Sequence, residues 1–263
     1  AQNNKTSGLN ARQFHKYWKV ESESPDYKVT FLGDTVEILS PKGLTLWRKE
    51  KMSGKVTIEY DACVVVEVEG DRLSDLNCFW MASDPQYPDN IWKREKWRSG
   101  IFLNCYSLQL YYMGYGGNHN STTRFRRYDG NEAAITNAKA RPAILKEYTD
   151  ADHLLEANKW YHIKITNENN RVSYYINGVR LVDFRDADPL TEGWFGFRTT
   201  LSRTRIANFH YECSPQEISE IPLHWIGDTP QQDRTVSLGV PFSEGELYPE
   251  NTLQLITDRG ETL

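Results

Sequence analysis

The segment from Tyr111 to Gly130, YYMGYGGNHNSTTRFRRYDG, concentrates residue types that act on charged ligands. Arginine guanidinium groups bind carboxylate or sulfate through two parallel hydrogen bonds. Histidine and tyrosine side chains can transfer protons, and neighbouring arginines would lower the pKa of a phenol. The segment therefore allows two interpretations: a site for an anionic ligand, or a glycine turn between two exposed strands.

Strand alternation predicts how the run TTRFRRYDG is divided between two faces. One face carries the polar set Arg124, Arg126 and Tyr128. The other face carries Phe125 and Arg127. If Phe125 faces the core, the polar set lines an open face and can bind a ligand. A structural alternative pairs these arginines across strands with Glu59 and Asp61.

The glycine-rich half of the segment predicts a tight turn, because glycine tolerates backbone conformations that other residues avoid. The turn would place four side chains at a rim: Tyr115, Asn118, His119 and Asn120. His119 titrates near neutrality and could act as a base, although a solvated loop histidine is the simpler interpretation. Tyr112 and Tyr115 are alternative bases.

Two carboxylates offer a different chemistry. Glu59 and Asp61 share one face of the run VTIEYDACVVVEV and lie about 7 Å apart by the strand rise. Retaining glycosidases place two carboxyl groups about 5–5.5 Å apart. Cys63 occupies the third position of an E-x-D-x-E pattern, so the pattern is incomplete. A glycoside hydrolase is therefore an alternative function for the chain. The structural explanation is that Glu59 and Asp61 only form salt bridges.

Aromatic residues make up 13% of the chain, a content common where sugar faces are stacked. Candidate sugar contacts outside the first segment are Asn77, Trp80, Trp92, Trp97, Trp194 and Arg198. Trp194 and Arg198 alternate onto one face of GWFGFRTT, although core packing would also explain Trp194. Asn77 lies near Trp80 in sequence but on the opposite strand face. Trp92 and Trp97 belong to a charged loop and are expected to be exposed.

Short alternating runs separated by Gly, Asn, Asp and Pro predict an all-β chain. In VTIEYDACVVVEV the apolar positions from Val56 to Val66 share one face. Asn177-Gly178 predicts a hairpin turn. Residues 84–100 are interpreted as a long loop, and a short helix or turn is expected at 152–158. The pattern predicts an antiparallel β-sandwich of the jelly-roll type.

Charge and cysteine content limit the partners. The formal net charge is −5, which gives no general attraction to nucleic acid or to an anionic membrane surface. No apolar stretch reaches eighteen residues, so no transmembrane helix is expected. The four cysteines show no C-x-x-C spacing, which argues against zinc. Three lie in strand-like apolar runs, including LNCFWM and FLNCYS, and buried free thiols are expected, with one disulfide as the alternative.

The composition changes after Cys213. We predict a jelly-roll domain over residues 1–213, followed by a linker and the start of a second β-domain over 214–263. Fifty residues rarely form an independent core, so these residues are either the first portion of that domain or a tail on the sandwich.

The sequence pattern of WYHIKITNENNRVSYYINGVRLVDFRDADPLTEGWFGFRTT resembles that of concanavalin-A-like jelly rolls of carbohydrate-active proteins. SDLNCFWMASDP and YYMGYGGNHNSTTRFRRYDG look like a jelly-roll module of secreted bacterial enzymes for uronic-acid polysaccharides. The end of the chain, VSLGVPFSEGELYPENTLQLITDRGETL, is similar to the opening of the β-barrel domain of exo-rhamnogalacturonan-lyase-like proteins.

These resemblances imply a polysaccharide lyase that cleaves ulvan- or rhamnogalacturonan-type glycan by β-elimination. The resemblance assigns no catalytic residues; from the residue types and strand positions we predict a catalytic set of Tyr112, Tyr115, His119, Arg124, Arg126 and Tyr128, with substrate contacts from Asn77, Trp80, Asn118, Asn120, Trp194 and Arg198. A non-catalytic carbohydrate-binding module of a modular lyase, or a glycoside hydrolase, are the alternatives. The expected protein is a secreted, periplasmic or cell-surface monomer that binds acidic polysaccharide, needs no cofactor and could hold a structural calcium ion.

Overall fold

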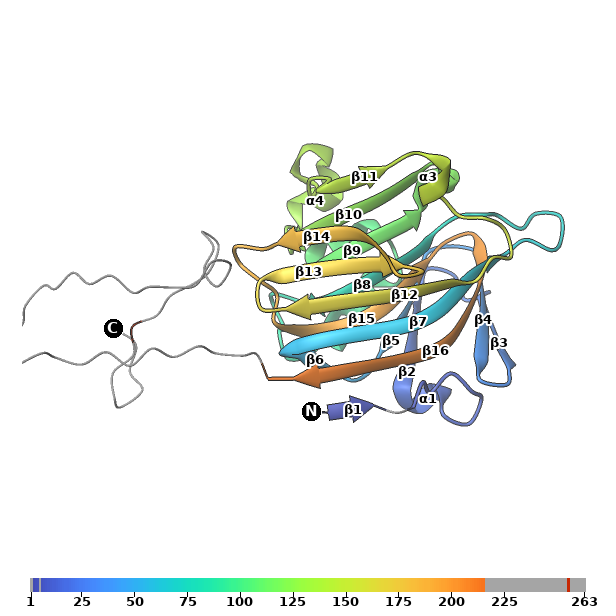
Figure 1. Cartoon of the computed structure of the whole chain (residues 1–263), viewed down its shortest axis with the longest axis horizontal. Helices are drawn as coiled ribbons and strands as arrows, with labels where there is room; N and C mark the ends of the chain where they lie inside the picture. Colours follow the sequence, from blue (N-terminus) through green and yellow to red (C-terminus); the bar gives the residue numbers. More distant parts are fainter. Residues whose placement is uncertain (1, 5, 216–254, 256–263) are drawn as a thin grey trace, which may run out of the picture.

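A computed structural model describes residues 2–4, 6–215 and 255 of the chain, with side chains from residue 6 onward. In this part, two antiparallel sheets pack face to face as a β-sandwich (Figure 1). The predicted fold class is therefore confirmed. The predicted linker and second β-domain lie outside the described residues from 216 onward, apart from residue 255. Among the described residues, no helix has the length and apolar character needed to cross a membrane.

Sheet A follows the order β14-β13-β12-β7-β16-β4-β3. Its strands are β14 (Val179–Arg185), β13 (Arg171–Ile176), β12 (Tyr161–Glu168), β7 (Lys55–Val65), β16 (Ser202–Ser214), β4 (Thr35–Ser40) and β3 (Lys28–Leu32). The short β1 (Gln2–Asn4) pairs with the end of β16.

Sheet B follows the order β11-β10-β9-β8-β15-β5-β2. Its strands are β11 (Lys146–Tyr148), β10 (Thr122–Asp129), β9 (Gln109–Gly116), β8 (Leu76–Ser83), β15 (Glu192–Thr199), β5 (Leu44–Arg48) and β2 (Trp18–Ser22). The two-residue β6 (Met52–Ser53) pairs with the start of β15.

The alternation read from β7 is confirmed within the strand. Its inward residues Val56, Ile58, Tyr60, Ala62 and Val64 are all buried in the core between the sheets. The predicted hairpin is also confirmed, because β13 and β14 are joined by Asn177 and Gly178 with φ of 49° and 80°. Positive φ at both positions matches the right-handed twist of the flanking strands.

All four cysteines are free thiols, as expected. Burial raises the pKa of Cys78 to about 12 and that of Cys105 to about 11. The strand predicted at FLNCYS is wrong: Cys105 lies in the 3-10 helix η2 (Leu103–Ser107). Short apolar runs fit strands and buried helical turns equally well, so periodicity could not separate them.

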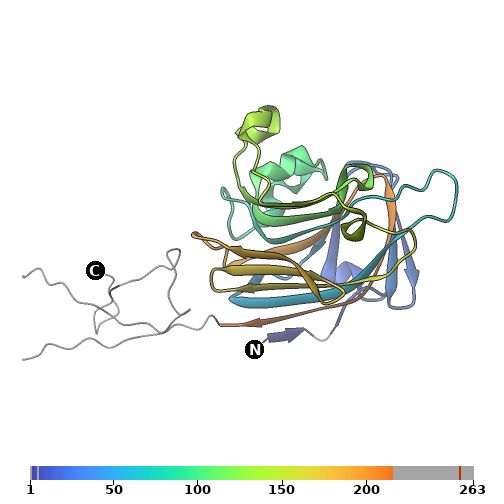
Figure 2. The ribbon, with the colours of Figure 1, turned by 45° about the horizontal axis from the view of Figure 1, so that its top comes forward.

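The outer face of sheet B is covered by a segment that the sequence predicted to be a plain loop. Residues 84–107, here called the cover, contain η1 (Ile91–Arg94), α2 (Glu95–Arg98) and η2. Figure 2 shows these short helices on the side of sheet B away from sheet A, with α4 (Ala133–Thr136) beside them.

A second hydrophobic cluster joins the cover to the sheet. Trp47, Phe79, Tyr112, Tyr128 and Trp194 from the sheet pack with cover residues such as Ile91 and Tyr106. The face predicted to be open is therefore largely closed.

The remaining short elements lie at the ends of strands. They are α1 (Phe14–Tyr17), α3 (Gly117–Asn120), η3 (Ala138–Ala140) and η4 (Ala151–His153). The last of them overlaps the short helix or turn expected at 152–158.

Candidate functional site

The strand register brings three predicted site residues into one row across the outer face of sheet B. From β11 to β2, the paired residues of this outer row are Glu147, Arg124, Gly114, Asn77, Arg198, Thr45 and Glu21. Phe125 next to Arg124 is buried in the core, so the predicted division of β10 between two faces is confirmed. Strands lie about 4.8 Å apart, which places the backbones of Arg124 and Arg198 about 14 Å from each other.

Tyr112 lies in the next row of β9, and its hydroxyl stands over Gly114 of the outer row. A Cβ added at Gly114 would stand 2.4 Å from the Tyr112 Oη, so only glycine leaves room for this phenol. Tyr112 pairs with Arg126 in the next row of the sheet. Its side chain is 8% exposed, and its hydroxyl makes no hydrogen bond with the described residues. The Tyr112 hydroxyl is not among the fully buried polar atoms that lack a partner, so water or a ligand can reach it and accept its hydrogen bond.

The two arginines at this end of the sheet differ in their partners. Arg124 Nε donates to Glu147 Oε1 at 2.5 Å, so its charge is paired. Arg126 Nη1 donates to the Pro142 carbonyl, and Arg126 has no carboxylate partner in the described part of the chain. Arg126 is therefore an uncompensated cation beside the Tyr112 hydroxyl. We call the patch formed by Arg124, Arg126 and Tyr112 the arginine end.

The structural alternative for these arginines is wrong. Glu59 and Asp61 lie on β7 in sheet A, and neither pairs with Arg124 or Arg126. The alternative failed because the sequence does not show which strands share a sheet.

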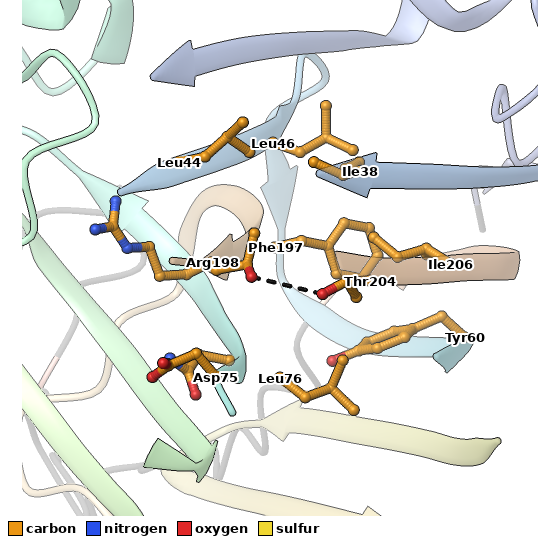
Figure 3. A pocket seen from close by; sticks show the side chains of 12 residues that line it. Ile38, Leu44, Leu46, Tyr60, Asp75, Leu76, Phe197, Arg198, Thr204 and Ile206 are labelled. Atoms are coloured by element: carbon orange, nitrogen blue, oxygen red, sulfur yellow. Dashed lines mark hydrogen bonds between the residues drawn. The ribbon is translucent and has the colours of Figure 1, made fainter. Parts of the chain in front are cut away.

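Asn77 contributes an unsatisfied acceptor in the same row. Its Nδ2 donates to Asp75 Oδ1 at 3.2 Å, but its Oδ1 has no hydrogen-bond partner among the described residues. Asn77 is 6% exposed. A small cavity of about 10 Å³ touches Asp75, Asn77 and Arg198 (Figure 3). Such a volume suits one water molecule at most and is too small for a sugar ring.

Arg198 does not face a ligand, contrary to the prediction. Its Nη1 donates to the Gly100 carbonyl at 2.6 Å and to Thr45 Oγ1 at 3.3 Å, and its guanidinium lies 5.4 Å from the Phe102 ring. Figure 3 shows this guanidinium turned away from Tyr60 and Ile206. Arg198 therefore attaches the cover to the sheet.

Two predicted stacking tryptophans are also buried. Trp194 donates its Nε1 to the Lys49 carbonyl at 3.2 Å beneath the cover, so the core-packing alternative describes it. Trp80 is stacked on Phe125 and Tyr174 between the sheets, where no ligand reaches it. By contrast, Trp97 is exposed and Trp92 is partly exposed, as expected.

The rim residues do not converge with the arginine end. Tyr115 points into the core side of β9 and donates to the Leu154 carbonyl at 3.3 Å. Asn120 exchanges two hydrogen bonds with the Leu155 backbone, so it fixes a loop. Asn118 bonds to Ser121 within the turn, and His119 is exposed at the tip with a φ of 57°.

The expected lowering of the phenol pKa is wrong for the tyrosines of the predicted set. Burial raises the pKa of Tyr112, and Asp75 raises it further, which outweighs the opposing effect of Arg198 and Arg126. Burial likewise raises the pKa of Tyr115 and Tyr128. A phenol with a raised pKa stays protonated at neutral pH, so it can donate a hydrogen bond but is a poor base.

A buried ion pair fixes the cover to the far end of the outer row, and a second ion pair lies within the cover itself. Arg98 is fully buried and donates to both Glu21 carboxylate oxygens, at 2.8 and 3.3 Å. Arg94 binds the buried Asp84 at 2.7 and 2.9 Å. Glu21 also accepts a bond from the Gly100 amide. The outer row thus holds structure at its β2 end, whereas the uncompensated Arg126 lies in the next row, on β10.

Glu59 and Asp61 are bound to other side chains on the solvent face of sheet A. His162 Nδ1 lies 2.7 Å from Asp61 Oδ1, and its Nε2 lies 3.0 Å from Glu59 Oε2. Lys164 lies 3.6 Å from Glu59, and Asn208 donates to Asp61 at 2.7 Å. This arrangement matches the salt-bridge explanation of the pair.

This cluster gives a pH prediction. Hydrogen bonds to Asp61 and then to Glu59 raise the pKa of His162 above its ordinary 6.5. The stabilisation of the folded state by protonated His162 is therefore complete below about pH 6.5, and it is lost as the pH rises through the raised pKa of His162. Because the His162 side chain is 47% exposed, we expect the cluster to contribute less than about 1 kcal/mol to the free energy of unfolding. Asp61→Asn should lower the pKa of His162 in an NMR titration; an unchanged pKa would contradict the assignment.

The described residues offer no clustered side chains for a metal ion. Among the described residues, no three or more His, Cys, Asp or Glu side chains group so as to hold a metal ion. In the acidic loop at residues 186–189, Asp186 accepts hydrogen bonds from Tyr111 and Arg127, both at 2.6 Å. Calcium stays a prediction.

The fold places this protein among galectin-like and lectin-like jelly rolls. A protein of unknown function with a galectin-like fold from Bacillus subtilis superposes with a TM-score of 0.65 at 14% identity, over 82% of this chain and 98% of that chain. The VIP36 exoplasmic/lumenal domain, in a Ca2+/Man3GlcNAc-bound form, gives a TM-score of 0.55 at 10% identity, over 83% and 93%. A legume lectin-like domain from Entamoeba histolytica gives 0.53 at 10% identity, over 81% and 97%.

The chain belongs to the family described as a domain of unknown function, DUF6250, which matches residues 38–209. Residues 219–263 match the PcRGLX-like N-terminal RIFT barrel domain. The two matches fall on either side of the domain boundary predicted after residue 213. A search of curated proteins found no match.

Proposed function

We propose that the sandwich is a glycan-binding domain without catalytic activity of its own, and that it binds an acidic sugar chain at the arginine end. The observation that carries the proposal is Arg126, a cation without a carboxylate partner among the described residues, paired across the strands with Tyr112, whose hydroxyl makes no hydrogen bond there. A guanidinium can bind a carboxylate or sulfate, and a protonated phenol can donate to a sugar oxygen.

The fold and the neighbouring match support this proposal. Lectin-like jelly rolls are similar in fold, and the VIP36 structure holds Man3GlcNAc. The match of residues 219–263 to a PcRGLX-like barrel supports a modular protein directed at rhamnose- and uronate-containing glycans. We accordingly propose that the chain acts outside the cytoplasm, as part of a lyase that cleaves elsewhere.

Calorimetric titration of the full chain tests the proposal. Polygalacturonate, rhamnogalacturonan, ulvan and glucuronan serve as acidic ligands, and neutral galactan serves as the control. We expect binding to at least one acidic polymer, weakened by salt because the contact is charged. Equal binding of galactan, or no binding of any acidic polymer, would contradict the proposal.

One observation favours β-elimination as a second candidate. Tyr112 and Arg126 pair across β9 and β10, and a lyase needs a cation or amide for the uronate carboxylate and a group that transfers a proton. Elimination creates an unsaturated uronate, so ultraviolet absorbance would rise on incubation with the polymers above. Loss of that rise in Tyr112→Phe would assign the lyase. New reducing ends without absorbance would instead indicate hydrolysis.

A further inference from the structure

A separate groove lies at the opposite edge of sheet B, along its terminal strand β2. Its volume is about 440 Å³, within the range typical of small-molecule sites. Phe14 and Trp18 are buried at its floor, and Tyr27 and Trp92 line it with partly exposed rings. We call it the β2 groove.

The groove is distant from the arginine end. The sheet row that contains Arg126 and Tyr112 continues through Phe79, Gly196 and Trp47 to Lys19 of β2. Five strand spacings separate Arg126 from Lys19, or about 24 Å. The cover lies between them, so the two sites are independent.

Trp92 is held in a fixed position at the side of the groove. Its ring packs edge-on against the buried Trp194, with centroids 6.3 Å apart. Lys19 Nζ lies 5.3 Å from the centroid of the Trp92 ring and also pairs with Glu95. The Asn90 side chain accepts from the Trp92 amide at 3.1 Å and caps the turn that carries it. A rigid, partly exposed ring provides a flat surface at low entropic cost.

The cations of the groove differ in their compensation. The charge of Lys19 is neutralised by Glu95. Lys49 is exposed, donates to the His15 carbonyl at 2.5 Å and has no carboxylate partner among the described residues. The groove therefore combines one free positive charge with an aromatic surface.

We propose that the β2 groove is a second binding site that takes one anionic sugar unit. The sugar ring packs on Trp92, and its carboxylate or sulfate pairs with Lys49. A neutral apolar ligand would leave Lys49 unused, whereas an anionic sugar unit uses both the aromatic surface and the charge. The proposal does not require binding at the arginine end.

Tryptophan fluorescence of the full chain tests the proposal, with oligomers of galacturonate, of glucuronate and of sulfated rhamnose-glucuronate as probes. At least one acidic oligomer should bind. Trp92→Ala should weaken it about tenfold, and Lys49→Gln should weaken it several-fold and reduce its salt dependence. Methyl esterification of the uronates should have an effect similar to that of Lys49→Gln.

Matched controls separate this site from the arginine end. Trp160, 44% exposed just before β12, and Lys139 lie outside the groove, so the Trp160→Ala and Lys139→Gln variants should bind normally. Arg126→Ala should keep the binding that depends on Trp92 and Lys49. The proposal is overturned if no acidic oligomer binds, if Lys49→Gln leaves the affinity for the oligomer unchanged, or if the methyl ester binds equally well. Capture of an acidic peptide along β2 in place of the oligomers would also overturn it.

Discussion

Replacement of Arg98 by alanine is expected to lower the free energy of unfolding by about 3–5 kcal/mol, because it leaves the Glu21 carboxylate buried without its counter-ion. The orphaned charge would also weaken the attachment of the cover at Gly100. Urea unfolding of the full chain, followed by tryptophan fluorescence, measures the change.

The control for this prediction is an ion pair exposed to solvent. Arg171 binds Asp183 at 2.6 and 2.7 Å on the surface of sheet A, and Arg171→Ala should cost less than about 1 kcal/mol. Equal losses for the two variants would show that the buried pair does not hold the cover.

Replacement of Arg126 by alanine is expected to weaken binding of the acidic glycan by about 10- to 100-fold at the arginine end. A hydrogen bond to a charged group contributes about 1.5–3 kcal/mol, which corresponds to that range. Arg126→Lys should restore part of the affinity, since it keeps the charge but loses the forked geometry. Calorimetry with the tightest acidic polymer measures both variants.

Arg124→Ala is the matched control for this loss. Arg124 lies on the same strand face, but its charge is already paired with Glu147, so its removal should have the smaller effect. An effect of Arg124→Ala larger than that of Arg126→Ala would contradict the role given to the uncompensated cation.

The local parts of the fold were predictable because they depend on neighbours in sequence. Alternation located β7 and the two faces of β10, and Asn177-Gly178 located a turn that needs two positive φ values. The row that joins Arg124, Asn77 and Arg198 depends on the register of four strands. That register is set by non-local pairing, which the sequence does not show directly.

The cover explains the errors at Trp194, Arg198 and Tyr112. Trp194 and Arg198 do share a face, but a segment nearly a hundred residues away in sequence packs over them. The same burial reverses the expected shift in the pKa of Tyr112, because desolvation outweighs the neighbouring arginines. A signal was present in the 84–107 segment, where apolar residues such as Ile91 and Phe102 interrupt the charges.

The central claim is that Arg126 and Tyr112 receive the acidic group of a glycan. The most direct measurement is the structure of the full chain in complex with an oligosaccharide of the acidic polymer it binds. The account predicts a carboxylate or sulfate oxygen within about 3 Å of an Arg126 guanidinium nitrogen, with a sugar oxygen on the Tyr112 hydroxyl. An oligosaccharide bound only elsewhere, with Arg126 still in contact with nothing but the Pro142 carbonyl, would contradict it.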